Sequence, residues 1–213
     1  MVFMGMGEPF ANYEAVSRAV GALNAPWGLG LAARHITVST VGLVPEIHRF
    51  AQEYGQVGLA ISLHAPNDQL RSALVPVNRK YPLAQLLGAC REYVTRTSRR
   101  VSFEYVLLDG VNDSIEQARE LASLLSGLLC HVNLIPVNPT AEGQFRRPSS
   151  KRIDAFVGEL RRLHVPVTLR DTKGVEIQAG CGQLRVRNGD GIDEGKAAPL
   201  PVFEELAGHI NCC

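Results

Sequence analysis

The chain has 213 residues, of which 46% are apolar, and its 22 lysines and arginines nearly balance its 21 aspartates and glutamates. This length supports one main hydrophobic core but is short for a complete eight-stranded barrel. The near-zero net charge favours neither a nucleic-acid-binding protein nor a membrane-surface protein. No stretch reaches the ~18 consecutive apolar residues that cross a bilayer, so we expect a cytoplasmic location.

Hydrophobic periodicity predicts strands that alternate with helices, which is typical of an α/β protein with a parallel sheet and crossover helices. The first half of the chain contains a predicted strand 1–6, helix 12–23, strand 36–39, helix 44–54, strand 57–63, short helix 68–74 and helix 83–96. The second half contains a predicted strand 101–107, helix 115–128, strand 131–135, helix 150–163, strand 167–170 and a short strand or turn around 180–182. Consecutive parallel strands without a Gly-x-Gly-x-x-Gly fingerprint favour a partial (β/α) barrel over a Rossmann sheet.

The barrel is predicted to occupy residues 1–187. Residues 188–213 are rich in glycine, proline and charge and are expected to form a flexible tail, in which 202–210 could form one marginal helix. Because the chain opens directly within a strand, we also expect it to be the carboxyl-terminal part of a larger enzyme, or to have lost its true start.

Small or polar residues follow each predicted strand. They are Gly7-Glu8, Ser39-Thr40, Ser62 and His64 with Asn67-Asp68, Asp109 with Asn112-Asp113, and Asn138. In an α/β barrel these positions share the carboxyl edge of the strands, where such folds carry their chemistry. The alternative is that they are turn formers. Glu8 in particular could accept hydrogen bonds from a ligand or cap the next helix.

The five cysteines are scattered and form neither a disulfide framework nor a Cys-x-x-Cys pair. Cys90 and Cys130 end leucine-rich helical patterns and are predicted to be buried core residues, whereas Cys212 and Cys213 end a polar tail. Cys181 differs from these because glycines flank it on both sides and basic residues precede it, which favours an exposed thiolate. It is a candidate nucleophile, although a cysteine without a task in a glycine-rich turn would look the same.

Two other patterns bear on function. Ser62 and His64 have no third partner and no Gly-x-Ser-x-Gly elbow, so His64 is predicted to contact a ligand rather than to act as a hydrolase base. Residues 146–187 contain ten basic and four acidic side chains. This excess predicts either a surface for a polyanion or a solvated helix face with loop arginines.

Seven segments, in order along the chain, resemble the radical S-adenosylmethionine RNA methyltransferases of the RlmN and Cfr type. They are Met4 to Pro9, Thr37 to Gly42, Ala60 to Asp68, Val75 to Asn78, Glu104 to Asp113, Asn133 to Pro139, and Cys181 to Leu184. The resemblance runs to about residue 187. It implies a partial radical-SAM barrel that methylates an adenine carbon, C2, in 23S ribosomal RNA, with transfer RNA as a second candidate substrate.

The resemblance also implies the site. Gly7 and Glu8 would hold the amino group and ribose end of S-adenosylmethionine, and Ser39, the Ser62-Leu63-His64 segment and Asn138 would complete the pocket. Cys181 would be methylated by one S-adenosylmethionine. A second would be cleaved reductively at a [4Fe–4S] cluster, and the resulting radical would activate the S-methyl group for addition to adenine. An electron donor such as flavodoxin, a monomeric state and no membrane partner are implied as well.

The departures from that family are equally specific. Its Cys-x-x-x-Cys-x-x-Cys cluster motif, its second catalytic cysteine and its small amino-terminal RNA-binding domain are not found in these 213 residues, so no metal ligand is assigned and this chain alone is predicted to be inactive. Lys173 and Gly180 stand where arginine and alanine are usual. Two alternatives therefore remain: a non-catalytic remnant that binds S-adenosylmethionine or RNA, and an unrelated barrel enzyme with Cys181 as an ordinary nucleophile.

Overall fold

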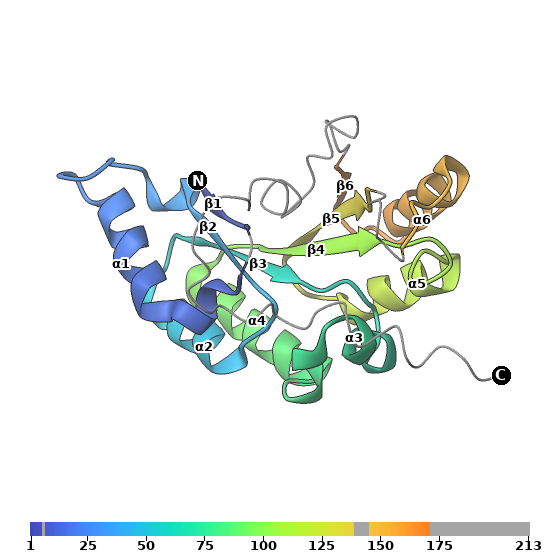
Figure 1. The fold of residues 1–213 in the computed structure, drawn as a ribbon, viewed down its shortest axis with the longest axis horizontal. Coiled ribbons are helices and arrows are strands. Elements are labelled where there is room, and N and C mark those ends of the chain that lie inside the picture. Colours follow the sequence, from blue (N-terminus) through green and yellow to red (C-terminus); the bar gives the residue numbers. More distant parts are fainter. Residues whose placement is uncertain (6, 139–144, 171–213) are drawn as a thin grey trace, which may run out of the picture.

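Six parallel strands form one sheet whose spatial order is the same as their order in the chain (Figure 1). The computed structural model describes residues 1–5, 7–138 and 145–170. The strands are β1 (Val2–Phe3), β2 (Thr37–Thr40), β3 (Gly58–Ser62), β4 (Val101–Leu107), β5 (Cys130–Pro136) and β6 (Val167–Leu169). Each strand pairs in parallel with the next, and β1 and β6 remain the two edges.

The helices lie along one side of this sheet (Figure 1). They are α1 (Tyr13–Asn24), α2 (Val44–Glu53), α3 (Asp68–Leu74), α4 (Leu83–Thr97), α5 (Ile115–Leu124) and α6 (Ser150–Arg162), with 3₁₀ turns η1 (Pro9–Asn12), η2 (Ala33–His35) and η3 (Pro76–Arg79). Crossovers between parallel strands are right-handed, so a chain that always advances to the next strand in the same direction places every helix on the same face. This is the topology of a partial (β/α) barrel, as the sequence predicted.

The burial of alternate residues along the strands distinguishes the helix-covered face of the sheet from its inner face. Along β4, Val101, Phe103, Tyr105 and Leu107 are all fully buried in the main hydrophobic core. The alternate residues Ser102, Glu104 and Val106 stand on the opposite face, because side chains along a strand alternate. In the part of the chain that the structure describes, no helix covers that inner face, which is polar along much of its length.

Most predicted elements are confirmed, and the misses occur at their ends. Helix 68–74 and strand 101–107 have the predicted bounds. The first strand is predicted over residues 1–6 but has ladder pairing only at Val2 and Phe3, because an edge strand pairs on one side and glycines follow it. The helix predicted to reach residue 128 ends at Leu124, where the chain turns toward Gly127 at φ = +71°.

The buried cysteines are confirmed, since Cys90 and Cys130 both lie in the core. Burial raises the pKa of the Cys90 thiol to about 12 and that of Cys130 to about 11. Cys181, Cys212, Cys213, the turn at 180–182, the helix at 202–210 and the domain boundary at 187 lie outside the described residues. None of the described helices is both long and apolar enough to cross a membrane.

Asn112 joins the loop after β4 to the end of β3. Its amide Nδ2 donates to the carbonyl oxygens of His64 at 2.8 Å and Val106 at 2.7 Å, and its Oδ1 accepts from the backbone N–H of Leu108 at 2.7 Å. The side chain is fully buried. One amide therefore satisfies three backbone groups that helix and sheet ladders leave unpaired at this edge.

We predict that Asn112→Asp lowers the free energy of unfolding by about 3 kcal/mol, because a carboxylate of the same shape loses both donors and faces two carbonyl oxygens. Urea unfolding measures the loss. The matched control is Asn24→Asp, in which an exposed amide donates to Leu31 O at 2.7 Å, and it should cost less than about 1 kcal/mol. Equal losses in the two variants would contradict a special role for Asn112.

Candidate functional site

The carboxyl edge of the sheet gathers most of the residues that the sequence singled out. Ser39 on β2, Ser62 on β3 and His64 just beyond β3 stand on or beside the inner face, and Glu8 follows β1. Asn138 follows β5. Leu63 differs because its side chain is fully buried in the core, its N–H donates to Glu104 O and its carbonyl accepts from Arg71.

Glu8 performs the capping role that the sequence left as an alternative. Its Oε1 accepts from the N–H of Phe10 at 3.0 Å, at the start of η1, and its Oε2 accepts from the N–H of Val41 at 2.7 Å, after β2. Burial raises the pKa of this carboxyl, and the two backbone hydrogen bonds oppose that rise. Gly7 precedes it at φ = +93°, which L residues rarely adopt. Both oxygens keep lone pairs that could also accept from a ligand.

Arg71 is the residue that the sequence reasoning missed at this edge. Although it lies on the short helix α3, it is fully buried. Its Nη2 donates to Val41 O at 2.6 Å and Ser62 O at 3.1 Å, its Nε donates to Leu63 O at 3.1 Å, and its Nη1 donates to Asn78 Oδ1 at 2.8 Å. The guanidinium thus ties together the ends of β2 and β3. Burial lowers its pKa to about 10.

The side chain of His64 makes a hydrogen bond with the backbone of strand β4. Its backbone is left-handed, with φ = +59°, and its imidazole Nδ1 accepts from the N–H of Val106 at 3.2 Å. Since Nδ1 is the acceptor, a neutral ring carries its proton on Nε2 and can donate from there. Burial, and secondly the charge of Arg71, lower the pKa of His64 to about 4. At neutral pH the ring is therefore neutral and can donate a hydrogen bond from Nε2.

Asn138 differs from the other polar residues of this edge because its side chain is buried without a hydrogen-bond partner in the described chain. It is only 8% exposed, yet neither its Nδ2 nor its Oδ1 finds a hydrogen-bond partner in the described chain. A buried amide without partners costs free energy in the ligand-free protein, and such exceptions are rare. The amide can donate and accept at once, so it suits a polar ligand with adjacent donor and acceptor groups.

The other polar residues of this edge serve the backbone. Asn67 caps α3, and Asp68 Oδ1 accepts from the Leu83 N–H and the Asn78 amide, both at 2.8 Å. Asp113 is buried and takes two hydrogen bonds of 2.6 Å from Arg152. For these residues the turn-former interpretation is correct. By contrast, neither Ser39 nor Ser62 uses its hydroxyl in a hydrogen bond with a described residue.

The basic excess of residues 146–187 is partly neutralised where the structure describes it. Arg152 pairs with Asp113, and Arg162 pairs with Glu159, which also holds Arg119 from α5. The arginines lower the pKa of Glu159 to about 2. The solvated-helix interpretation therefore accounts for the paired part of α6, and residues beyond 170 lie outside the description.

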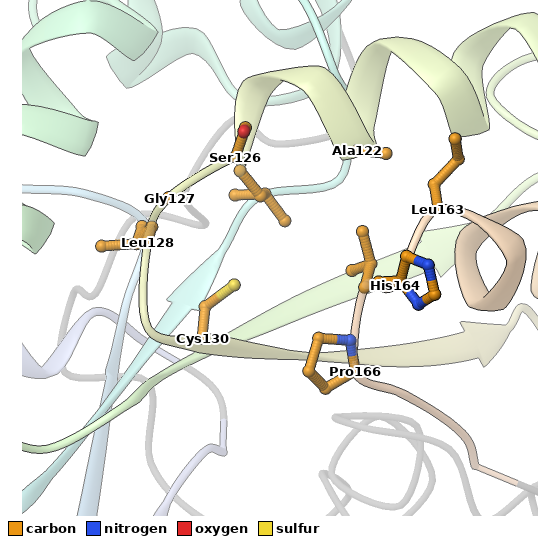
Figure 2. Close-up of a pocket in the computed structure, with 10 residues that line it drawn as sticks. Ala122, Ser126, Gly127, Leu128, Cys130, Leu163, His164 and Pro166 are labelled. Carbon is orange, nitrogen blue, oxygen red and sulfur yellow. The ribbon is translucent and has the colours of Figure 1, made fainter.

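A small hollow of about 190 Å³ lies at the opposite edge of the sheet, between the ends of α5 and α6 (Figure 2). Cys130, the first residue of β5, contributes to it with His164 and Pro166. It is smaller than typical ligand pockets and lies at the amino end of its strands, whereas α/β proteins bind ligands at the carboxyl end. It is therefore a separate feature from the candidate site.

The fold and this edge define a class: a partial (β/α) barrel with polar side chains gathered at the carboxyl ends of its strands. The family model described as "Radical SAM superfamily" matches residues 1–122, and the chain belongs to that superfamily. The superfamily implies S-adenosylmethionine as ligand, together with a [4Fe–4S] cluster.

Within the radical SAM superfamily, the chain is similar in sequence to proteins that are named as RNA methyltransferases. The chain is 58% identical over 188 residues to a "Probable dual-specificity RNA methyltransferase RlmN" of Desulforudis audaxviator, covering 88% of this chain and 59% of the relative. It is 50% identical to a protein of the same name from Caldanaerobacter subterraneus, covering 87% of this chain and 54% of the relative. The chain thus spans between half and three fifths of the length of these relatives.

Two solved structures resemble the fold. A radical SAM methyltransferase from Sphaerobacter thermophilus matches with a TM-score of 0.82 and 61% identity, over 85% of this chain and 53% of that one. A domain of a pyruvate-formate lyase-activating enzyme from Bacteroides vulgatus matches with a TM-score of 0.58 and 20% identity, over 80% of this chain and 98% of that one. The second likeness concerns the fold alone. The first confirms the radical-SAM methyltransferase resemblance.

We predict that the His64 ring stays neutral on acidification until about pH 4, because protonation would place a charge on a desolvated nitrogen that accepts the Val106 N–H. Its folded pKa lies below the unfolded value, so its contribution to stability is complete above pH 6.5 and is lost as the pH falls toward 4. Nitrogen-15 NMR of the ring measures the pKa and the Nε2–H tautomer. Spectra of His64→Asn assign the signal, and titration near pH 6.5 would contradict the prediction.

Proposed function

We propose that this chain forms the S-adenosylmethionine-binding barrel of an RNA methyltransferase that methylates C2 of an adenine in 23S ribosomal RNA, in the cytoplasm. Transfer RNA is a second candidate substrate. The observation that carries the proposal is the buried, unpartnered amide of Asn138 at the carboxyl edge of a radical SAM barrel. The high identity to proteins named as dual-specificity RNA methyltransferases supports the RNA substrate.

The chemistry of the edge suits S-adenosylmethionine. An asparagine amide can donate to one position of an adenine edge and accept from the next, as Asn138 is free to do. The neutral His64 ring and the hydroxyls of Ser39 and Ser62 add donors around it. Gly7 and Glu8 would hold the amino group and ribose end of S-adenosylmethionine, with Glu8 using lone pairs that the backbone hydrogen bonds leave open.

Cys181 is proposed as the methyl carrier. Its thiolate would attack the sulfonium methyl group, so that a new S–C bond forms while the S–CH₃ bond of S-adenosylmethionine breaks and S-adenosylhomocysteine leaves. Adenine C2 has no lone pair for an ordinary methyl transfer, which is why the family needs a radical to activate the carried methyl group. This role rests on the Cys181-Gly182-Gln183-Leu184 resemblance.

The iron–sulfur cluster does not fit the residues of this chain. The described residues contain no group of three His, Cys, Asp or Glu side chains that could hold a metal ion, and no three of the sequence's five cysteines have the spacing of the cluster motif. A bound cluster would supply the electron that cleaves S-adenosylmethionine. The cluster therefore enters no step that we assign to the residues of this chain.

We predict that Asn138→Ala weakens S-adenosylmethionine binding about tenfold while the free energy of unfolding of the ligand-free chain changes by less than about 1 kcal/mol. The reason is that the amide has hydrogen bonds to lose only when a ligand is bound. Calorimetric titration and urea unfolding measure the two quantities, with Asn24→Ala as the control at an exposed asparagine. Unchanged affinity in Asn138→Ala would place the ligand elsewhere.

The methyl transfer itself is testable in a chimera in which this chain replaces the matching segment of the Desulforudis relative. Anaerobic assays with ribosomal RNA should yield 2-methyladenosine, and Cys181→Ala should reduce the product at least about 1,000-fold because the methyl carrier is lost. Cys213→Ala, beyond the region of resemblance, is the control. Product from the Cys181→Ala chimera would refute the assigned carrier, and 8-methyladenosine would refute C2 as the target.

A second candidate is a non-catalytic protein that keeps S-adenosylmethionine or RNA binding. The missing cysteine spacing favours it for this chain taken alone. The two candidates separate in the chimera with the Desulforudis relative: 2-methyladenosine from that chimera supports the methyltransferase, whereas a chimera that binds S-adenosylmethionine and yields no methylated adenine supports the non-catalytic protein.

A further inference from the structure

A row of three polar residues crosses the inner face of the sheet below its carboxyl edge. Ser62 on β3 pairs in register with Glu104 on β4, and Glu104 pairs with Asn133 on β5. Residues in register on neighbouring parallel strands point to the same side. Because Phe103 and Tyr105 lie in the helix-covered core, Glu104 and its two neighbours stand on the inner face.

Glu104 has a buried side chain, and one of its two carboxylate oxygens has no hydrogen-bond donor among the described residues. It is 7% exposed, and its Oε1 accepts from Asn133 Nδ2 at 2.8 Å. Its Oε2 makes no hydrogen bond, and the carboxylate makes no ion pair, with any residue that the structure describes. Burying a carboxylate without a cation costs free energy, which partners that donate hydrogen bonds can offset. The row therefore presents an acceptor whose second oxygen has no described donor.

The surroundings restrict the group that could donate to it. Val106 and Ile135, the next residues along the same face toward the carboxyl edge, are apolar. Val106 is partly buried against the small apolar cluster of Ala65, Leu74, Val75 and Leu108. The flat aromatic face of a base can lie against the exposed part of such side chains while the sugar attached to it reaches the polar row. A carboxylate only accepts, so it matches hydroxyl or amine donors and repels phosphate. The RNA backbone is thereby disfavoured at this position.

Resting on the proposed function, we propose that Glu104, oriented by Asn133, accepts hydrogen bonds from the ribose diol of S-adenosylmethionine. Two vicinal hydroxyls can donate to one carboxylate, and hydrogen bonds to a charged acceptor are stronger than neutral ones. The Ser62 hydroxyl, one strand away, lies on the same side. Glu104 is then a binding residue, and Asn133 is a positioning residue that holds its carboxylate.

The test uses 5′-methylthioadenosine, which keeps the base and ribose but lacks the amino-acid end, and its 2′,3′-dideoxy analogue. Calorimetric titration compares both ligands on the chain and on Glu104→Gln. We expect Glu104→Gln to weaken 5′-methylthioadenosine about tenfold, and removal of the diol to weaken binding to the unaltered chain by a similar factor. Glu104→Gln should bind 5′-methylthioadenosine and its dideoxy analogue with nearly equal affinity, because the carboxylate that accepts from the diol has been removed.

The matched control is Glu120→Gln, since Glu120 accepts from the Asn67 amide at 2.8 Å in the same kind of pair, but on the exposed surface of α5. It should bind both ligands like the unaltered chain. An equal loss for both ligands in Glu104→Gln would indicate a purely structural role and overturn the inference. Weakened S-adenosylmethionine with unchanged 5′-methylthioadenosine would assign Glu104 to the ammonium group and overturn it as well.

Failure of this inference and failure of the proposed function give different results. If Asn138→Ala weakens ligand binding and Glu104→Gln does not, the proposed S-adenosylmethionine site is supported and only the contact between Glu104 and the ribose is contradicted. If the unaltered chain binds neither S-adenosylmethionine nor 5′-methylthioadenosine, the proposed site falls and the ribose contact falls with it.

Discussion

The direction of the crossovers is the constraint on which the rest of this structure depends. Each parallel strand is followed by its neighbour on the same side, so right-handed crossovers place all six described helices on one face (Figure 1). The helix side takes the apolar alternate residues of each strand. The other alternate set, including Ser62 and Glu104, remains on an inner face that the described helices leave uncovered. A site at the carboxyl edge follows from topology before any residue is assigned a role.

The carboxyl edge of the sheet also contains backbone groups that the strand ladders do not pair. Strands that end at different heights leave unpaired N–H and C=O groups, and these must find partners when they are buried. Arg71, Asn112, Glu8 and the His64 ring supply those partners from side chains. Arg71 and Asn112 thus hold the backbone of this edge, whereas Glu8 keeps lone pairs and the His64 ring keeps an N–H that a ligand could use.

Two polar groups at the site differ from these because they lack partners among the described residues. Asn138 has an amide with no hydrogen bond in the described chain, and the second carboxylate oxygen of Glu104 has no described donor. The Asn138 amide is buried at a free-energy cost that a ligand could offset, and the second oxygen of Glu104 is an acceptor that a ligand could use. Membership of the radical SAM superfamily indicates the class of ligand, S-adenosylmethionine.

The sequence by itself determined the alternation of strands and helices, the partial barrel, the buried cysteines and the edge at which Ser39, Ser62, His64 and Asn138 meet. These follow from local periodicity and chain order, which a sequence states directly. Only the tertiary structure decided that Arg71 is buried and that Glu8 caps η1. It also decided that Glu104 faces inward beside Asn133. Arg71 reads as an ordinary helix residue and Glu104 as part of an apolar strand, because burial and pairing depend on neighbours distant along the chain.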